Sequence, residues 1–120
     1  MCVSSETFFL LSYNMHGFRQ GIVELQSLTN ELSLDIIFVQ EHWQTDATLD
    51  IFPQHFPGFS FFGTSACYNI GNDSVPCGSP MGGLGCLVSR KYAGNTKFIF
   101  STDRILIVIV GRYVFVNVYL

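Results

Sequence analysis

The sequence predicts a single α/β domain that starts with a β-α-β unit and continues as a β-rich second half. Two continuous apolar runs, Thr7–Tyr13 and Asp35–Gln40, have the composition of strands buried on both faces. The segment between them, Gln20–Ser33, has the apolar spacing of an amphipathic helix. With 120 residues, the chain has room for one domain at most.

The three elements of the β-α-β unit each have their own signal. Thr7–Tyr13 is too short for a helix, is rich in β-formers and runs into the turn-forming stretch Asn14–Gly17. The strand Asp35–Gln40 follows after one crossover helix, which predicts that the two strands are parallel neighbours. The apolar residues of the helix recur at spacings of three and four, and they are Ile22, Leu25, Leu28 and Leu32.

The second half predicts two loops and a series of strands. Residues 44–58 form a loop that contains two prolines, and the polar stretch Thr64–Gly83 forms a longer one. Gly111-Arg112 predicts a two-residue type II′ hairpin turn between the last two strands. The predicted strands are Phe59–Gly63, Leu84–Ser89, Lys97–Ser101, Arg104–Val110 and Tyr113–Leu120.

The composition excludes disorder and a membrane-spanning helix. Hydrophobic residues make up 48% of the chain and charged residues 12%. The longest apolar run, Ile105–Val110, is far shorter than the roughly 18 residues that a membrane helix needs. Because the N-terminus has neither the basic region nor the cleavage site of a signal peptide, we expect an intracellular protein, in the nucleus or cytoplasm, with no membrane partner.

The end of the sequence predicts that residues 1–120 are a partial domain, truncated on the C-terminal side. The chain stops inside an apolar β pattern, Val118-Tyr119-Leu120, with neither a turn nor a polar tail. The low charge content also fits a domain whose surface is incomplete. We therefore expect the front half of a larger α/β domain.

The charges show no electrostatic footprint for nucleic acid, and the cysteines show no zinc-ligand spacing. The net charge is −3, and no Lys or Arg occurs between Arg19 and Arg90, so no basic stripe for nucleic acid is present. An acidic region of this kind is where a carboxylate that holds a divalent cation would lie. The four cysteines form no C-x-x-C pair and fit no zinc-ligand spacing, although Cys67 and Cys77 are placed to bridge if the protein is secreted.

Polar side chains follow the two strands of the β-α-β unit. Asn14 follows the first strand, and Glu41 with His42 follows the second. Because adjacent parallel strands lie about 4.8 Å apart, Asn14 and Glu41 can converge on one site at the carboxyl ends of the strands. A carboxylate there can hold Mg²⁺, although a Glu at such a position is more often a solvated loop or cap residue. His42 points the other way from its neighbour, which predicts a packing or surface role.

Four segments, in this order, resemble the endonuclease/exonuclease/phosphatase superfamily, and within it the apurinic-like endonuclease domain of non-long-terminal-repeat retrotransposons. The resemblance covers about residues 7–120. The segments are Leu11-Ser-Tyr-Asn-Met-His-Gly17, Asp35-Ile-Ile-Phe-Val-Gln-Glu-His-Trp43, Gly82-Gly-Leu-Gly-Cys-Leu-Val88, and Asp103-Arg-Ile-Leu with Val116-Asn-Val-Tyr-Leu120.

The resemblance implies a fold, a reaction and roles for four residues. The fold is the N-terminal part of a four-layer α/β sandwich, with two β-sheets flanked by helices. The reaction is Mg²⁺- or Mn²⁺-dependent hydrolysis of a phosphodiester, with DNA as the substrate of the complete domain and a reverse transcriptase domain downstream. Glu41 is the implied metal ligand, Asn14 and Tyr119 are the implied catalytic residues near the phosphate, and Arg104 is either structural or phosphate-facing.

The sequence also departs from the family pattern. His16 stands where apurinic endonucleases have an acidic residue, and the Gly-Asp-x-Asn and Ser-Asp-His motifs of the family lie downstream of the Tyr119 motif, outside this chain. We therefore expect the 120-residue chain to be inactive. Two alternatives stay open: a non-catalytic remnant or interaction fragment, and, within the enzymes, a lipid or inositol-phosphate phosphatase.

Overall fold

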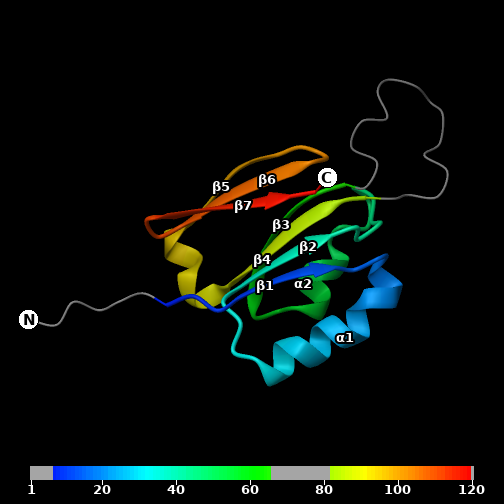
Figure 1. Cartoon of the computed structure of the whole chain (residues 1–120), viewed down its shortest axis with the longest axis horizontal. Coiled ribbons are helices and arrows are strands. Elements are labelled where there is room, and N and C mark those ends of the chain that lie inside the picture. The colour runs from blue at the N-terminus through cyan, green and yellow to red at the C-terminus, as the bar shows by residue number, and fades with distance from the viewer. Residues whose placement is uncertain (1–6, 66–81, 120) are drawn as a thin grey trace, which may run out of the picture.

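A computed structural model describes residues 7–65 and 82–119 of the chain (Figure 1). The elements of the first half are β1 (Leu10–Asn14), α1 (Phe18–Glu31), β2 (Ile36–Gln40), α2 (Ile51–His55) and β3 (Phe59–Thr64). Those of the second half are β4 (Leu84–Ser89), the 3₁₀ helix η1 (Arg90–Asn95), β5 (Thr96–Ser101), β6 (Ile105–Val110) and β7 (Tyr113–Val118).

The strands form two sheets. Sheet A has the order β1-β2-β4-β3, in which β1 and β2 are parallel and the other two pairings are antiparallel. Sheet B has the order β5-β6-β7 and is antiparallel throughout. The predicted β-α-β unit is confirmed, because α1 connects two parallel neighbours whose register pairs Asn14 with Gln40.

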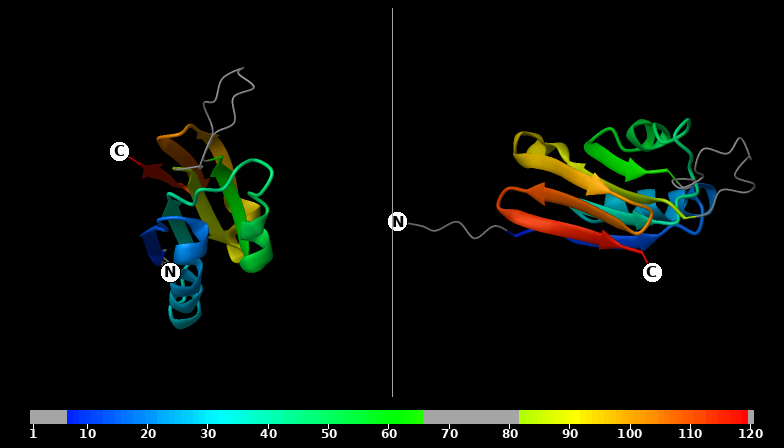
Figure 2. Two further views of the ribbon diagram at one scale, coloured as in Figure 1. Left: turned by 90° about the vertical axis from the view of Figure 1, so that its right-hand side faces the viewer. Right: turned by 90° about the horizontal axis from the view of Figure 1, so that it is seen from above.

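The elements stack in three layers, with sheet A in the middle (Figure 2). Alternate residues of β2 explain this, because Ile37 and Val39 face the helices whereas Ile36 and Phe38 face sheet B. The first core, between the helices and sheet A, includes Met15, Phe18, Leu25, Phe52, Phe56 and Leu87. The second core, between the sheets, includes Leu84, Cys86 and Val88 of sheet A and Leu106, Val108 and Val110 of sheet B.

The predicted α/β class with two sheets is confirmed, and the strand bounds differ by a few residues. The first strand begins at Leu10 rather than Thr7, because the Phe9 N–H donates to the Asp35 carboxylate (2.9 Å) instead of to a neighbouring strand. The predicted loop over residues 44–58 is wrong in part, since it contains α2. Proline is tolerated in the first turn of a helix, and Phe52 anchors α2 by stacking on Phe61 at 4.4 Å between ring centroids.

The outer face of sheet B differs from that of sheet A. Among the described residues, no helix packs on this face (Figure 2), and Val114, Val116 and Val118 of β7 are 61%, 51% and 50% exposed. The turn between β6 and β7 places Gly111 at φ 62°, a conformation that favours glycine and suits the predicted hairpin.

The structure also bears on membrane spans and on one of the cysteines. No helix within residues 7–65 and 82–119 has the length and apolarity to cross a membrane. Cys86 is free and buried between the sheets, and burial raises its pKa to about 12. Cys2, Cys67 and Cys77 lie outside the described residues, as does most of the predicted loop Thr64–Gly83.

Candidate active site

The carboxyl ends of β1 and β2 are joined by backbone hydrogen bonds that continue beyond the strands. The Met15 N–H donates to the Gln40 carbonyl (2.8 Å), and the Gly17 N–H donates to the Glu41 carbonyl (2.7 Å). The Phe18 N–H then donates to the His42 carbonyl (2.9 Å). The two chain segments therefore leave the sheet together, and the start of α1 is fixed to the segment that follows β2.

Asn14 and Glu41 meet at this edge. Asn14 Nδ2 donates to Glu41 Oε2 at 2.6 Å, and Asn14 Oδ1 accepts from the His16 N–H at 3.0 Å. The second bond fixes the orientation of the amide, because a backbone N–H only donates. Both side chains end at the protein surface, with Asn14 exposed and Glu41 half-buried.

Three residues here adopt the left-handed backbone conformation without being glycine. The φ angles are 49° at His16, 55° at Glu41 and 59° at Trp43. Each costs about 1 kcal/mol, so the flanking hydrogen bonds must hold the chain in this shape. Such strain is common where a side chain has to be aimed at a ligand.

His42 anchors the segment that carries Glu41. Its side chain is fully buried, with Nε2 donating to the Thr64 carbonyl (2.9 Å) and Nδ1 accepting from the Gln44 N–H (2.9 Å). Burial lowers the pKa of His42 to about 4, so the ring is neutral at pH 7. At Gly83, with φ 94°, a Cβ would overlap the imidazole. Of the two roles predicted for His42, packing or surface, the structure shows packing.

Tyr119 directly follows β7 of sheet B, and its N–H continues the pairing with the segment before β6. Phe115 packs against Phe38 with ring centroids 6.0 Å apart, and Asn117 accepts from Gln40 at 2.8 Å. Because side chains alternate along a strand, Tyr119 is the next residue on the inner side, level with the end of β2. The Tyr119 ring packs against the core between the sheets.

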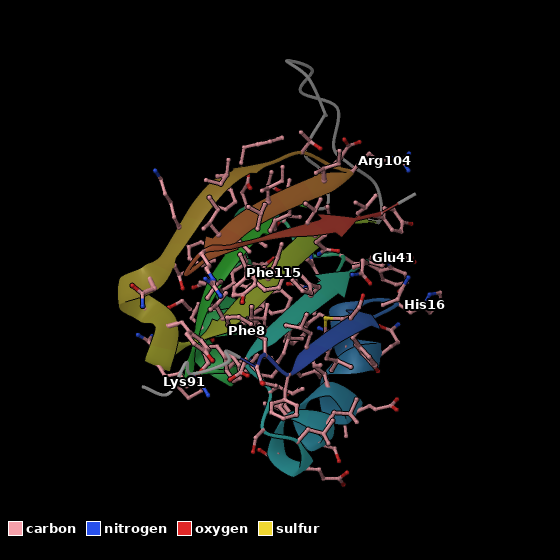
Figure 3. All side chains as sticks on the ribbon, turned by 60° about the vertical axis from the view of Figure 1, so that its left-hand side comes forward. Phe8, His16, Glu41, Lys91, Arg104 and Phe115 are labelled. Carbon is pink, nitrogen blue, oxygen red and sulfur yellow. The ribbon has the colours of Figure 1, made fainter. Side chains whose placement is uncertain are left out.

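Arg104 is a neighbour of Tyr119. Its guanidinium carbon lies 5.8 Å from the centroid of the Tyr119 ring, and its carbonyl accepts from the Tyr119 N–H at 2.8 Å. Figure 3 shows Arg104, Glu41 and His16 at the same end of the molecule, with Lys91 at the other end. We call the end that carries Asn14, Glu41, Arg104 and Tyr119 the site end.

Two residues of the site end were not anticipated from the sequence. Gln40 and Asn117 are 8% and 3% exposed and join the two sheets below the site. Each is a single polar residue within an otherwise apolar strand, and this signal is visible in the sequence but equally fits an outward-facing side chain. Trp43 packs on His16 with ring centroids 5.3 Å apart, so the two rings join the segment after β1 to the segment after β2.

Among the described residues, Glu41 is the site-end carboxylate that contacts Asn14, whereas Asp103 lies 3.9 Å from the Arg104 guanidinium. Nowhere in residues 7–65 and 82–119 do three His, Cys, Asp or Glu side chains cluster as a ready-made metal site. The hydrogen bond from Asn14 is accepted by Glu41 Oε2, so the groups available to a cation are a carboxylate and a neighbouring amide. This set fits Mg²⁺, which keeps several waters and is usually bound through one or two carboxylates together with substrate phosphates. A hollow of about 340 Å³ beside α1 includes none of these residues.

The two-sheet α/β architecture is shared with solved structures of AP endonucleases and of a 3′ phosphatase. Neither a protein-family model nor a curated protein matches the sequence. The likeness is to solved structures of 12–14% sequence identity, and it shows the shared fold.

Three of these structures illustrate the match. The 3′ phosphatase NExo from Neisseria, bound to a product DNA hairpin, has a TM-score of 0.67 and 12% identity over 94% of this chain and 41% of its own. The AP endonuclease LMAP from Leishmania major has a TM-score of 0.66 and 12% identity, covering 90% of this chain and 38% of its own. An AP endonuclease from Archaeoglobus fulgidus gives 0.61 and 13%, covering 91% and 40%. This chain thus spans about two-fifths of their length.

Proposed function

We propose that this chain is the N-terminal part of a divalent-metal-dependent phosphodiesterase, a DNA endonuclease of retrotransposon type. The observation that carries the proposal is the contact between Asn14 and Glu41 at the ends of two parallel strands. The fold is shared with AP endonucleases and with a 3′ phosphatase bound to DNA. The retrotransposon assignment rests on the four sequence segments, and a downstream reverse transcriptase domain belongs to it.

In this proposal Glu41 is the ligand of Mg²⁺ or Mn²⁺. When bound, the cation polarises a phosphoryl oxygen and stabilises charge on it. The strained backbone at Glu41 and the buried anchor at His42 support this role, because together they hold the carboxylate at the surface against a conformational cost.

Asn14 and Tyr119 act on the phosphate in this proposal. The Asn14 amide has two N–H groups, of which one donates to Glu41 and the other is left for a phosphate oxygen. The Tyr119 hydroxyl is a second neutral donor, and neutral donors stabilise developing negative charge without competing for the cation. Arg104, packed on Tyr119, adds a fixed positive charge beside the substrate or holds the Tyr119 ring.

We further propose that the 120-residue chain does not cleave DNA by itself. Catalysis needs a group that activates water and a group that stabilises the leaving oxygen. The Gly-Asp-x-Asn and Ser-Asp-His motifs that the family uses for these steps do not occur in the sequence. The chain also spans only about two-fifths of the solved relatives.

The test combines metal binding with DNA cleavage. Mn²⁺ added to the isotope-labelled chain is expected to broaden the NMR signals of the Asn14 side-chain amide, and Glu41→Gln is expected to abolish this effect. Glu31→Gln, on the exposed last turn of α1, is the matched control and should keep it. Absence of binding to Glu41 would favour a non-catalytic fragment.

Supercoiled plasmid with Mg²⁺ provides the second readout. The 120-residue chain should leave the plasmid intact, whereas a protein read from the transcript beyond codon 120 should nick it, provided that Glu41 is present. Nicking by the 120-residue chain that Glu41→Gln abolishes would overturn the proposed inactivity.

A further inference from the structure

We propose that Gln40 and Asn117 are a positioning pair, which sets the place of Tyr119 on sheet B relative to Asn14 and Glu41 on sheet A. The inference rests on the proposed function, because it concerns the geometry of that same site. Both residues are buried below the site, and neither faces a substrate.

The side-chain amide of Asn117 donates both of its hydrogens. Nδ2 donates to the carbonyls of Val39 (3.1 Å) and Gly85 (3.0 Å), which belong to neighbouring strands of sheet A. Oδ1 accepts from Gln40 Nε2 at 2.8 Å, and Gln40 Nε2 also donates to Ser12 Oγ at 3.2 Å. Asn117 of sheet B is therefore fixed by three bonds to two strands of the other sheet.

Gln40 and Asn117 are each close in sequence to a candidate site residue, so a shift of the pair moves the site. Gln40 directly precedes Glu41, and Asn117 is two residues before Tyr119 on the inner side of β7. If sheet B slid along sheet A, these three bonds would break before the apolar contacts around them were lost, because hydrogen bonds depend on direction and distance. The pair thus defines one register of the sheets where an apolar interface alone would allow several.

The surroundings of the pair favour a geometric role over a stabilising one. Leu84 and Leu106, which pair in register with Gln40 and Asn117, are fully buried. Burying two amides in such an interface costs free energy that their hydrogen bonds largely offset, so the net gain in stability is small. An apolar pair would fill the same space but would not form the directional hydrogen bonds between the sheets.

A second polar contact lies at the same level. The register of sheet A aligns Asn14, Gln40, Leu84 and Thr64 in one row. The Thr64 hydroxyl bonds the Ser101 hydroxyl of sheet B, and Ser101 lies in the row that contains Asn117. The two sheets are thus joined by side-chain hydrogen bonds at both sides of the site end.

The test replaces the pair by apolar residues of similar size. In the double variant Gln40→Leu, Asn117→Leu, no buried amide is left without a partner, and we expect a cooperative fold with a thermal midpoint close to that of the wild type. The single variant Gln40→Leu, which keeps both bonds from Asn117 to the carbonyls, should give a smaller change in geometry. Asp35→Asn, at the opposite end, is a control that perturbs stability away from the site.

The first readout uses Mn²⁺ as the probe. In the wild type, Mn²⁺ should broaden both the Tyr119 ring signals and the Asn14 side-chain amide. In the double variant, the ratio of the two effects should change by about twofold or more, because the broadening falls with the inverse sixth power of distance and misplacement of about 1 Å is expected. In Asp35→Asn the ratio should stay at the wild-type value.

The second readout needs no metal and separates this inference from the proposed function. Nuclear Overhauser effects between the rings of Phe38 on sheet A and Phe115 on sheet B, whose centroids lie 6.0 Å apart, report the register of the sheets directly. Altered Overhauser effects in the double variant support the positioning pair whether or not Mn²⁺ binds. Absence of Mn²⁺ binding would overturn the metal role of Glu41 alone. Unchanged effects in a folded double variant, or an unchanged ratio with Mn²⁺ bound, would overturn the positioning pair.

Discussion

The two ends of the sheet stack are held together by different means. At the site end, the sheets are joined by buried hydrogen bonds, among them Gln40 to Asn117, and the chain runs through strained residues such as Glu41. At the opposite end, the Phe8 ring packs between the sheets, with its centroid 5.2 Å from that of Tyr92 and 5.6 Å from that of Phe115 (Figure 3).

The difference shows how one small fold separates stability from geometry. Aromatic packing at the opposite end buries large apolar area and tolerates small shifts of the rings. The hydrogen bonds at the site end contribute little net stability but require one arrangement of atoms. The end that holds the candidate active site is therefore the end at which the relative position of the two sheets is defined more exactly.

The largest expected effect comes from the aromatic packing around Phe8. Phe115→Ala should lower the free energy of unfolding by about 3 kcal/mol, because it removes a ring that contacts both Phe8 and Phe38 and leaves a cavity. Chemical denaturation monitored by circular dichroism measures this loss. Phe98→Ala, which removes a ring that is 40% exposed, is the control and should cost clearly less. Equal losses would contradict the contribution of the Phe115 ring to packing between the sheets.

A pH dependence should come from the site end. His42 has a pKa of about 4 in the folded state, against about 6.5 when unfolded, so the unfolded state binds an extra proton between these values. Stability is then fully present above about pH 6.5 and falls by about 3 kcal/mol as the pH drops from 7 to 4. Unfolding curves of the wild type and His42→Gln test this, since the variant should lose that part of the slope. The same slope in both proteins would rule out His42 as its source.

Strain at the candidate metal ligand predicts an unusual gain. Glu41→Gly should be more stable than Glu41→Gln by about 1 kcal/mol, because glycine adopts φ 55° without the clash that any side chain meets. At Glu24, exposed in the interior of α1, the matched control Glu24→Gly should be less stable than Glu24→Gln. If Gly and Gln were equivalent at position 41, the backbone there would not be strained.

The smallest effect on folding is expected on the outer face of sheet B. Val114→Thr with Val116→Thr keeps the β-branched shape and should change the free energy of unfolding by less than about 0.5 kcal/mol, because both side chains are more than half exposed. The solubility limit should nevertheless rise, since an exposed apolar face promotes association. Precipitation by ammonium sulfate compares the two proteins, and a lower limit for the variant would contradict this expectation.

The sequence was sufficient for the elements that depend on periodicity. The parallel pairing of β1 with β2, and with it the meeting of Asn14 and Glu41, followed from two apolar runs separated by one helix. The helix α2 was not predicted, because five residues are too few to show a helical period and one side chain, Phe52, anchors it.

Other features of the site had no local signal. Left-handed backbone is expected at Gly or Asn, whereas Glu41 and Trp43 are held in it by hydrogen bonds to residues far along the chain. The link from Gln40 to Asn117 joins residues 77 positions apart, and only the packing of the two sheets brings them together. Local pattern predicts strands well, but it does not predict which side chains of different sheets meet.

Trp43 is the only tryptophan of the chain, and its place next to Glu41 has a practical consequence. The ring is half-buried against His16, so its fluorescence spectrum depends on whether this particular loop is closed around it. Intrinsic emission therefore reports opening of the loop separately from global unfolding, which circular dichroism follows through the strands. A red shift that precedes the loss of dichroism would reveal that the site opens while the rest of the chain is still folded.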